Sequence, residues 1–329
     1  MDLWQQRIDT DGARRGEPQR VTTGIGMRSA AFSPDGSKLA YTRGRGIVSN
    51  VWRVPLLSHR EATWSDAEQL TFDEALIEFI DVSPDGQRLA LSSDRSGNQD
   101  LWSLSASGGE MTQLTFDPTP DWSPSWSPDE TEMAFYAYRS GNRDIWVMPL
   151  DGSPPRQLTR HQASDLSPFW SPDGEDIVFS STRSGAIGVW VVPAEGGEPR
   201  AVAEEPGDNY PAWSPDGAWI AFISGRSGGP RLWRTLAEGG EAQQLTHRPS
   251  DGQPRWSPDG KEIYFVSGGE RGSNLWAVSL EDGRERSLTD FTGRPGALGT
   301  AALATDGEYL YFTWEDYVGD LWVMDVVDE

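Results

Sequence analysis

A four-residue phrase, Ser-Pro-Asp-Gly, recurs through the whole chain and constrains its fold more than any other feature. Five copies are intact and two are degenerate, and they begin at Ser33, Ser83, Ser127, Ser171, Ser214, Ser257 and Ala304. Successive copies start 50, 44, 44, 43, 43 and 47 residues apart. A period of about 40–50 residues is typical of propeller blades or solenoid units, none of which buries its apolar face alone. The chain is therefore predicted to fold as a repeat array.

One repeat is sufficient to predict the local structure. Within residues 120–159, apolar and aromatic runs at 124–126, 133–136, 144–148 and 156–159 are separated by segments rich in Gly, Pro, Asn and Asp. Such runs are typical of strands joined by tight turns. In the phrase itself, Pro presets the turn backbone, Asp bonds to the backbone two residues on, and Gly accepts a positive φ. Its aspartates are therefore predicted to form turns and not to bind metal.

The motifs that follow the phrase recur in a fixed order. After Trp-Ser-Pro-Asp-Gly come an apolar strand, Ser-x-Arg-Ser-Gly, Asp-Leu-Trp, Gly-Gly-Glu and Leu-Thr. This order resembles the TolB-like β-propeller repeat, and it is also similar to the propeller modules of dipeptidyl-peptidase and tricorn-type proteases. Those proteases keep their catalytic serine in a separate hydrolase domain, and no such domain is encoded here. The resemblance covers the whole chain and implies an all-β propeller that acts in scaffolding or sensing.

Seven pairs of first and second strands predict a seven-bladed propeller of four-stranded antiparallel blades, forming one domain over residues 1–329. The predicted blades are residues 23–71, 72–115, 116–159, 160–203, 204–246, 247–289 and 290–329. Because the last unit lacks a fourth strand, residues 19–22 are predicted to supply it and so to close the ring. In the alternative closure, residues 2–9 replace residues 320–327 as the third strand of that blade. If residues 2–9 are surplus, they indicate a longer original chain or a duplicated remnant.

The charge balance limits the classes of partner. The chain has 28 basic and 51 acidic residues, a formal charge of −23. Such a surface repels phosphate backbones and anionic lipids, so nucleic acid and membrane insertion are not expected, whereas a basic protein or a cation is favoured.

Composition also bears on the compartment. The chain has no cysteine, which excludes disulfides and thiolate sites. No signal peptide and no apolar run of about 18 residues is present as written. We expect a monomer, periplasmic if a leader or anchor was removed and otherwise cytoplasmic.

The repeat register exposes a second series of residues at the mouth of the predicted channel. Five residues before the first-strand Trp, four blades carry an aspartate: Asp121, Asp165, Asp208 and Asp251. The equivalent residues of the other blades are apolar: Met27, Ile77 and Leu298. Because binding residues concentrate on loops held by a rigid scaffold, we expect these acidic and apolar arcs to bind a peptide or protein with a basic group.

Two further sets on the same face have alternative interpretations. Arg95, Arg139, Arg183 and Arg226 lie where they could pair with the aspartates and join neighbouring blades, which would make the series structural. Met27, Ile77 and Leu298 are in that case core residues lining the channel. Trp122 is either an aromatic anchor for the partner or a side chain packed on its own blade.

Catalytic motifs are lacking. The chain has no Gly-x-Ser-x-Gly, no His-Glu-x-x-His and no phosphate loop. A metal site would need His161 and His247, from loops two blades apart, together with Asp165 or Asp251. No cofactor is expected, and no motif supports a cation such as calcium at the channel mouth. We therefore predict a non-enzymatic protein-interaction module; the alternative is a metal-dependent lyase or hydrolase with its site at the channel mouth.

Overall fold

The structure is a computed structural model that describes residues 4–8, 14–20, 27–35, 37–248, 252–268 and 272–325. These residues belong to two compact units. One comprises Ser49–Glu315, and the other comprises the described residues before and after that range. Among the described residues, no helix is long and apolar enough to cross a membrane.

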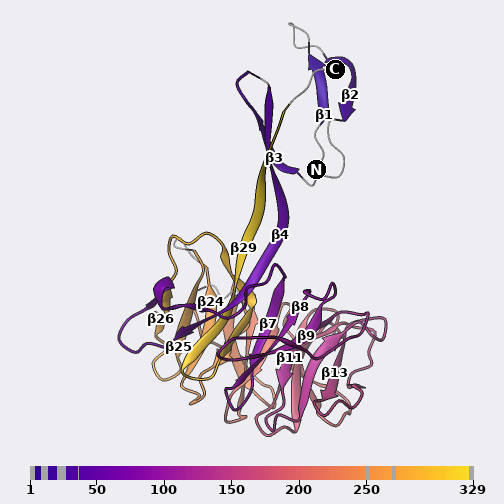
Figure 1. The fold of residues 1–329 in the computed structure, drawn as a ribbon. Coiled ribbons are helices and arrows are strands. Elements are labelled where there is room, and N and C mark those ends of the chain that lie inside the picture. The colour runs from indigo at the N-terminus through magenta and orange to yellow at the C-terminus, as the bar shows by residue number, and fades with distance from the viewer. Residues whose placement is uncertain are drawn as a thin grey trace. The chain divides into compact units, whose positions relative to one another are not determined.

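The unit Ser49–Glu315 is a propeller of six blades (Figure 1), each with strands A to D in antiparallel order. Blade 1 is β7 (Ile77–Val82), β8 (Arg88–Ser93), β9 (Asp100–Ser105) and β10 (Thr112–Gln113). Blade 2 is β11 (Asp121–Trp126), β12 (Glu132–Ala137), β13 (Asp144–Pro149) and β14 (Arg156–Gln157). Blade 3 is β15 (Asp165–Trp170), β16 (Asp176–Ser181), β17 (Gly188–Pro193) and β18 (Arg200–Ala203).

The next two blades repeat this pattern. Blade 4 is β19 (Asn209–Trp213), β20 (Trp219–Ser224), β21 (Arg231–Leu236) and β22 (Gln243–Gln244). Blade 5 is β23 (Arg255–Trp256), β24 (Glu262–Ser267), β25 (Asn274–Ser279) and β26 (Glu285–Ser287). The A strands of successive blades contact one another around the ring, from β7 to β23 and on through blade 6. These strands therefore line a central channel.

Blade 6 closes the ring with strands from both ends of the chain. Its A and B strands are β28 (Ala297–Thr305) and the first part of β29 (Tyr309–Asp325), whereas its C and D strands are the last part of β4 (Lys38–Pro55) and β6 (Glu68–Gln69). The Leu56 amide donates to the Glu308 carbonyl oxygen at 2.8 Å. A parallel pair, β27 (Thr289–Asp290) with β5 (Ala62–Thr63), and the 3₁₀ turn η1 (Trp64–Asp66) lie beside this closure.

The predicted count of seven blades is wrong, and neither β1 nor β2 supplies a strand of the closing blade, although strands from the N-terminal and C-terminal parts of the chain do share it. In the first predicted blade, residues 23–71, a turn is expected between the second and third strands. That turn is absent, because β4 continues extended through residues 41–48 to the C strand of blade 6. Residues 14–20 form β2 (Arg14–Arg20), which pairs with β1 (Trp4–Ile8) and with no strand of a blade. The first copy of the phrase, at Ser33, lies between β3 (Met27–Phe32) and β4, in the unit outside the propeller.

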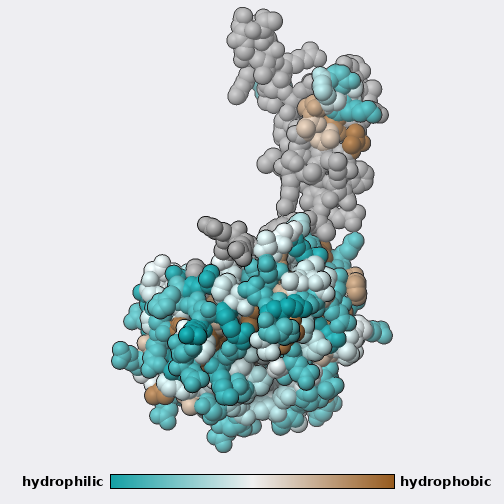
Figure 2. Space-filling view, turned by 90° about the vertical axis from the view of Figure 1, so that its left-hand side faces the viewer, coloured by the Kyte–Doolittle hydropathy of each residue, from teal (hydrophilic) through white to brown (hydrophobic). Residues whose placement is uncertain are grey.

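The propeller core is built between blades. Leu89 and Leu91 of blade 1 pack with Ala304 and Tyr311 of blade 6 in one apolar cluster. Each blade from the second to the sixth buries a B-strand phenylalanine completely: Phe135, Phe179, Phe222, Phe265 and Phe312. Figure 2 shows that the outer surface turned to the viewer is mostly hydrophilic, as the charge of −23 requires.

The recurring phrase forms the turns between strands A and B. In blade 1, the Ser83 hydroxyl donates to Asp85 Oδ1 at 2.6 Å, and the Gln87 amide donates to the same oxygen at 3.0 Å. These bonds hold the pKa of the Asp85 carboxyl below its ordinary value. Turns of successive blades also touch, since a Cβ added at Gly174 would lie 3.4 Å from Pro128. The aspartates are therefore turn formers, as predicted.

Candidate binding site in the central channel

Three of the predicted mouth aspartates are buried in ion pairs. Asp121 pairs with Arg139 at 2.6 Å, Asp165 with Arg183 at 2.8 Å and Asp208 with Arg226 at 2.5 Å. All three carboxylates are 0 % exposed. Each pair joins strands A and B of one blade, and not neighbouring blades, because the arginine follows the strand that pairs with its aspartate.

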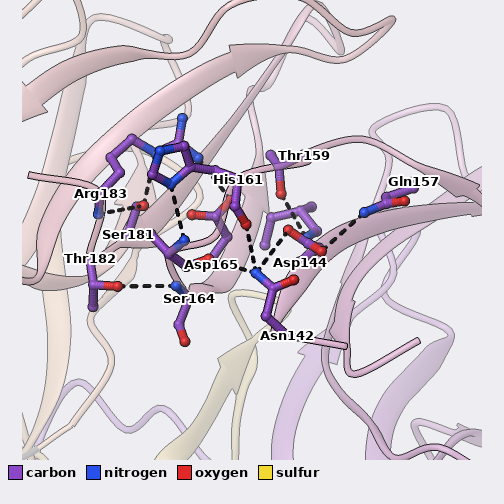
Figure 3. Close-up of polar contacts among 12 residues, drawn as sticks. Asn142, Asp144, Gln157, Thr159, His161, Ser164, Asp165, Ser181, Thr182 and Arg183 are labelled. Carbon is purple, nitrogen blue, oxygen red and sulfur yellow. Dashed lines mark hydrogen bonds and ion pairs between the residues drawn. The ribbon is translucent and has the colours of Figure 1, made fainter. Parts of the chain in front are cut away.

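Figure 3 shows the pair of blade 3 and its surroundings. Arg183 donates to Asp165 and, from Nε, to Ser181 Oγ at 2.9 Å. His161 Nδ1 accepts from the Ala163 amide at 3.0 Å, so this nitrogen is used within the loop. Among the residues that the structure describes, no group of three or more His, Asp or Glu is placed to hold a metal ion.

Each strand-C tryptophan of the propeller lies beside an arginine. Arg139 and Arg183 lie 5.5 and 5.0 Å from the ring centres of Trp146 and Trp190. The other four arginine–tryptophan pairs are Arg95–Trp102, Arg226–Trp233, Arg248–Trp276 and Arg294–Trp52. Arg95 has the apolar Ile77 where Arg139, Arg183 and Arg226 have their aspartate, and it contacts Asp73 at 3.4 Å instead. The paired aspartates therefore orient arginines that cover aromatic rings, and their carboxylates are not available to a partner.

Of the other predicted mouth residues, two are buried in the propeller. Ile77 and Leu298 are 1 % and 3 % exposed and pack in the cores between blades. Met27 belongs to the unit outside the propeller, and Asp251 lies outside the described residues. Ile77 and Leu298 therefore do not form an exposed apolar surface.

A different set of residues gathers at this end of the channel. Trp122 lies in strand β11 and stacks on Tyr136 of its own blade, with ring centres 5.4 Å apart. Tyr136 is also edge-on to Phe79 at 6.1 Å. Burial raises the pKa of the Tyr136 hydroxyl, and the negative charge of Glu78 adds to this effect. Trp122, Tyr136, Phe79 and Tyr210 belong to blades 1, 2 and 4, and we call them the aromatic wall.

Two carboxylates accompany the aromatic wall. Glu78 is the second residue of β7, and its Oε2 accepts from Gln99 Nε2 at 2.8 Å. Glu315 comes from the neighbouring blade 6, opposite Ala297 in the sheet. Burial raises the pKa of the Glu315 carboxyl, and the charge of Glu78 raises it further. Glu78 also raises the pKa of Tyr210, so these groups lie within electrostatic reach of one another. Two like charges held together favour a cation between them.

An arginine crosses the middle of the channel. Arg255 of blade 5 donates from Nη2 to the Ile80 carbonyl oxygen of blade 1 at 3.0 Å, and its guanidinium lies 5.1 Å from the Phe169 ring of blade 3. Asp81 is 3.9 Å away and accepts from the Trp126 amide at 2.9 Å. Burial lowers the pKa of Arg255 and raises that of Asp81. A side chain of blade 5 thus contacts blades 1 and 3 and links three alternate blades.

The register of the repeat holds a signal for this pair that the sequence analysis missed. One residue before the strand-A Trp, the six blades carry Asp81, Ser125, Phe169, Ala212, Arg255 and Ala302. Only two of these residues are charged, and they have opposite signs. Asp81 of blade 1 and Arg255 of blade 5 lie close together because, in a ring of six blades, only blade 6 with its small Ala302 separates their blades. A seven-bladed ring would have separated them.

A family model of the TolB beta propeller domain matches residues 5–153, 121–210 and 199–327. The chain belongs to this family. Among solved structures, a putative TolB from Agrobacterium tumefaciens is 22 % identical with a TM-score of 0.69, covering 83 % of this chain and 100 % of that one. This likeness supports the shared TolB-like fold and no particular activity.

Two other solved structures show how widely this fold is used. A chain of the nidogen/laminin complex is 12 % identical with a TM-score of 0.59, covering 74 % of this chain and 94 % of that one. A puromycin-hydrolyzing peptidase from Mycobacterium tuberculosis is 17 % identical with a TM-score of 0.54, covering 89 % of this chain and 52 % of that one. No curated protein matches the chain in sequence.

Proposed function

We propose that this TolB-like propeller is a non-enzymatic binding module. It binds a peptide or protein segment at the end of its channel where the connections between D and A strands and between B and C strands lie. A basic side chain of the partner lies between Glu78 and Glu315, and apolar parts lie on the aromatic wall. The observation that carries the proposal is that Glu78 of blade 1 and Glu315 of blade 6 lie within electrostatic reach of each other, and that Glu78 also acts on Tyr136 and Tyr210 of the aromatic wall. Such a combination of anchors and few polar groups is typical of binding sites.

Exposed aromatic residues on the same face support a protein partner. Phe72 and Phe116 are 79 % and 76 % exposed, and both lie in connections between a D strand and the next A strand. They occupy the same place in two successive Leu-Thr-Phe-Asp segments. Large exposed apolar side chains surrounded by polar residues are typical of an interaction surface. The nidogen/laminin complex shows a propeller of similar fold within a protein complex.

A random-peptide display selection with the purified chain tests this proposal. We expect enriched peptides to share a Lys or Arg next to an aromatic or aliphatic residue. Replacing both carboxylates, Glu78→Gln with Glu315→Gln, should remove the preference for the basic residue and weaken a selected peptide at least about tenfold, because the paired negative charge is lost.

The matched control removes two charges elsewhere. Glu198 and Glu241 are exposed residues of Gly-Gly-Glu turns between strands C and D. The Glu198→Gln, Glu241→Gln variant has the same net charge as the site variant and should select the same peptides as the wild type. An absence of basic residues among the selected peptides, or equal weakening by both variants, would show that the proposal is wrong.

A further inference from the structure

A recess lies at the end of the channel opposite the proposed binding site, and an inference from it is independent of the proposed function. Its volume is about 240 Å³, and its wall contains Val82, Phe169 and strand-A tryptophans of four blades: Trp126, Trp170, Trp213 and Trp256. Prolines of four Ser-Pro-Asp-Gly turns complete the rim: Pro84, Pro172, Pro215 and Pro258. This volume is below the range of about 300–1,000 Å³ of sites for drug-sized ligands, so one small group fills it.

The polar lining of this recess includes the guanidinium of Arg255 together with Asp81, Ser214 and Thr305. Arg255 lines it and is only 6 % exposed, and its Nε has no hydrogen-bond partner among the described residues. The buried indole N–H groups of Trp126, Trp170 and Trp213 also have no acceptor within that part of the chain. A buried donor without a partner is costly, and a guanidinium forms its strongest hydrogen bonds with a carboxylate.

The acidic neighbour does not satisfy the free edge of Arg255. Asp81 also lines the recess, but its nearest oxygen is 3.9 Å from Nη2, outside hydrogen-bond distance. Its other oxygen accepts from the Trp126 amide, and Nη2 is directed to the Ile80 carbonyl oxygen. Nη1 has a long contact of 3.5 Å with the Pro254 carbonyl oxygen. The Nε edge therefore remains for an acceptor that comes from outside the chain.

We propose that this recess binds the carboxylate of a small apolar acid, with the carboxylate on the Nε edge of Arg255 and the apolar part among the tryptophans. A planar carboxylate matches the fork of a guanidinium, whereas an ammonium point charge does not reproduce it. The rim of rigid prolines and the indole walls supply the apolar contacts. Two sources have this chemistry: a free organic acid and the C-terminal residue of a peptide.

Two probes that differ in one group test the proposal with the full chain. N-acetyl-phenylalanine has a free carboxylate, and N-acetyl-phenylalaninamide has a neutral amide in its place. Indole N–H resonances of the ¹⁵N-labelled protein, assigned by single Trp→Phe substitutions, report binding at Trp126, Trp170, Trp213 and Trp256. We expect titrations followed by these resonances to give a Kd for the acid at least about tenfold lower than that for the amide. Equal shifts with both probes, or none at millimolar acid, would overturn the proposal.

Variants connect the binding to one side chain. Arg255→Lys keeps the charge but removes the Nε edge, and it should weaken the acid about tenfold. The control, Arg284→Met, removes an arginine whose side chain is 87 % exposed, and it should bind the acid like the wild type. If Arg255→Lys binds the acid unchanged, the assignment to Arg255 is wrong. Where that variant does not fold, the comparison of the two probes on the wild type still decides.

A third probe distinguishes the two sources. Acetyl-Ala-Ala-Phe with a free C-terminus ends in the same residue as the small acid. If the recess receives a chain terminus, this peptide shifts the same indole resonances and binds with a Kd no higher than that of N-acetyl-phenylalanine. If the rim admits only free acids, the peptide does not shift them. Both results support the carboxylate site, provided that the acid binds more tightly than the amide.

Discussion

The Arg255 guanidinium donates to the carbonyl oxygen of Ile80 at 3.0 Å, although 175 residues separate them in the chain. Blade 5 is thereby tied to blade 1 across the channel, past the small Ala302 of blade 6 that lies between them in the ring. Arg255 and Asp81 line the recess at the Ser-Pro-Asp-Gly turns, whereas Glu78 and Glu315 belong to the other end of the strands. The two proposed sites therefore have opposite charge preferences within one ring.

Removing this cross-channel contact should destabilise the propeller. In Arg255→Met, Asp81 loses its counter-charge and the Ile80 carbonyl loses its donor, while both stay buried. We expect the free energy of unfolding to fall by about 3–5 kcal/mol. In the double variant Arg255→Met, Asp81→Asn no uncompensated charge remains, so part of this loss should be recovered. Urea unfolding measures both values, and an equal loss in the two variants would contradict the explanation.

The buried ion pairs within blades should behave differently from exposed ones. Asp165→Ala leaves the Arg183 guanidinium without its acid partner over Trp190, and we expect a loss of roughly 3 kcal/mol in the free energy of unfolding. The exposed pair Arg284–Asp282, whose side chains are 87 % and 47 % exposed, provides the control. Asp282→Ala should cost less than about 1 kcal/mol. If the two substitutions cost the same, burial is not what gives the inner pair its importance.

The sequence predicts the blade and fails at the closure for a physical reason. Strand runs, turn residues and the Ser–Asp bonds are local, so the pattern at Ser83 to Gln87 is enough to predict them. Closure depends on which strands pair across the whole chain. The extended residues 41–48 carry Gly without the Arg-Ser-Gly turn signal of blades 1 to 4, and this absence was the only local sign that β4 continues.

The site was predictable only in part, because register does not give side-chain burial. Asp121, Asp165 and Asp208 were found from their spacing. In each of their blades, an arginine two residues after the B strand neutralises the aspartate. The channel pair of Arg255 and Asp81 depends on the number of blades, which the count of phrases gave wrongly. Glu78 and Glu315 have no repeated motif, since each belongs to one blade alone.

Turn glycines should be sensitive where they face the preceding blade. Gly217 has φ +73°, and a Cβ added there would lie 3.4 Å from Pro172. Gly217→Ala should therefore cost about 1–2 kcal/mol in the free energy of unfolding, from the left-handed backbone. Gly225→Ala is the control, because its added Cβ would meet no atom within 4 Å and its φ is not in the left-handed region. Thermal unfolding compares them, and equal melting temperatures would refute the prediction.

The segment of β5 and η1, residues 62–66 between strands C and D of blade 6, should be needed for ring closure. Trp64 of η1 lies 4.6 Å from Trp52 and 4.9 Å from both Phe291 and Trp314, measured between ring centres. Trp64→Ala should lower the free energy of unfolding by about 3–5 kcal/mol, and Trp64→Phe should lower it by less. Limited proteolysis should cut the alanine variant first near residues 288–297, where the closing strands meet. Protection there equal to the wild type would argue against this role.

Acid should destabilise the propeller through the turn aspartates. The serine hydroxyl of each turn lowers the pKa of Asp85, Asp173 and Asp259. Because the folded-state pKa is below the unfolded value of about 3.9, the stabilisation is complete above that value and is lost as the pH falls through the folded pKa. The variant Asp85→Asn, Asp173→Asn, Asp259→Asn should therefore show a shallower fall in melting temperature between about pH 4 and pH 2. The control replaces Glu110, Glu198 and Glu241, all exposed in Gly-Gly-Glu turns, by Gln and so removes the same charge. An acid profile that is shallower to the same extent in both variants would mean that net charge, and not the turn bonds, sets the acid sensitivity.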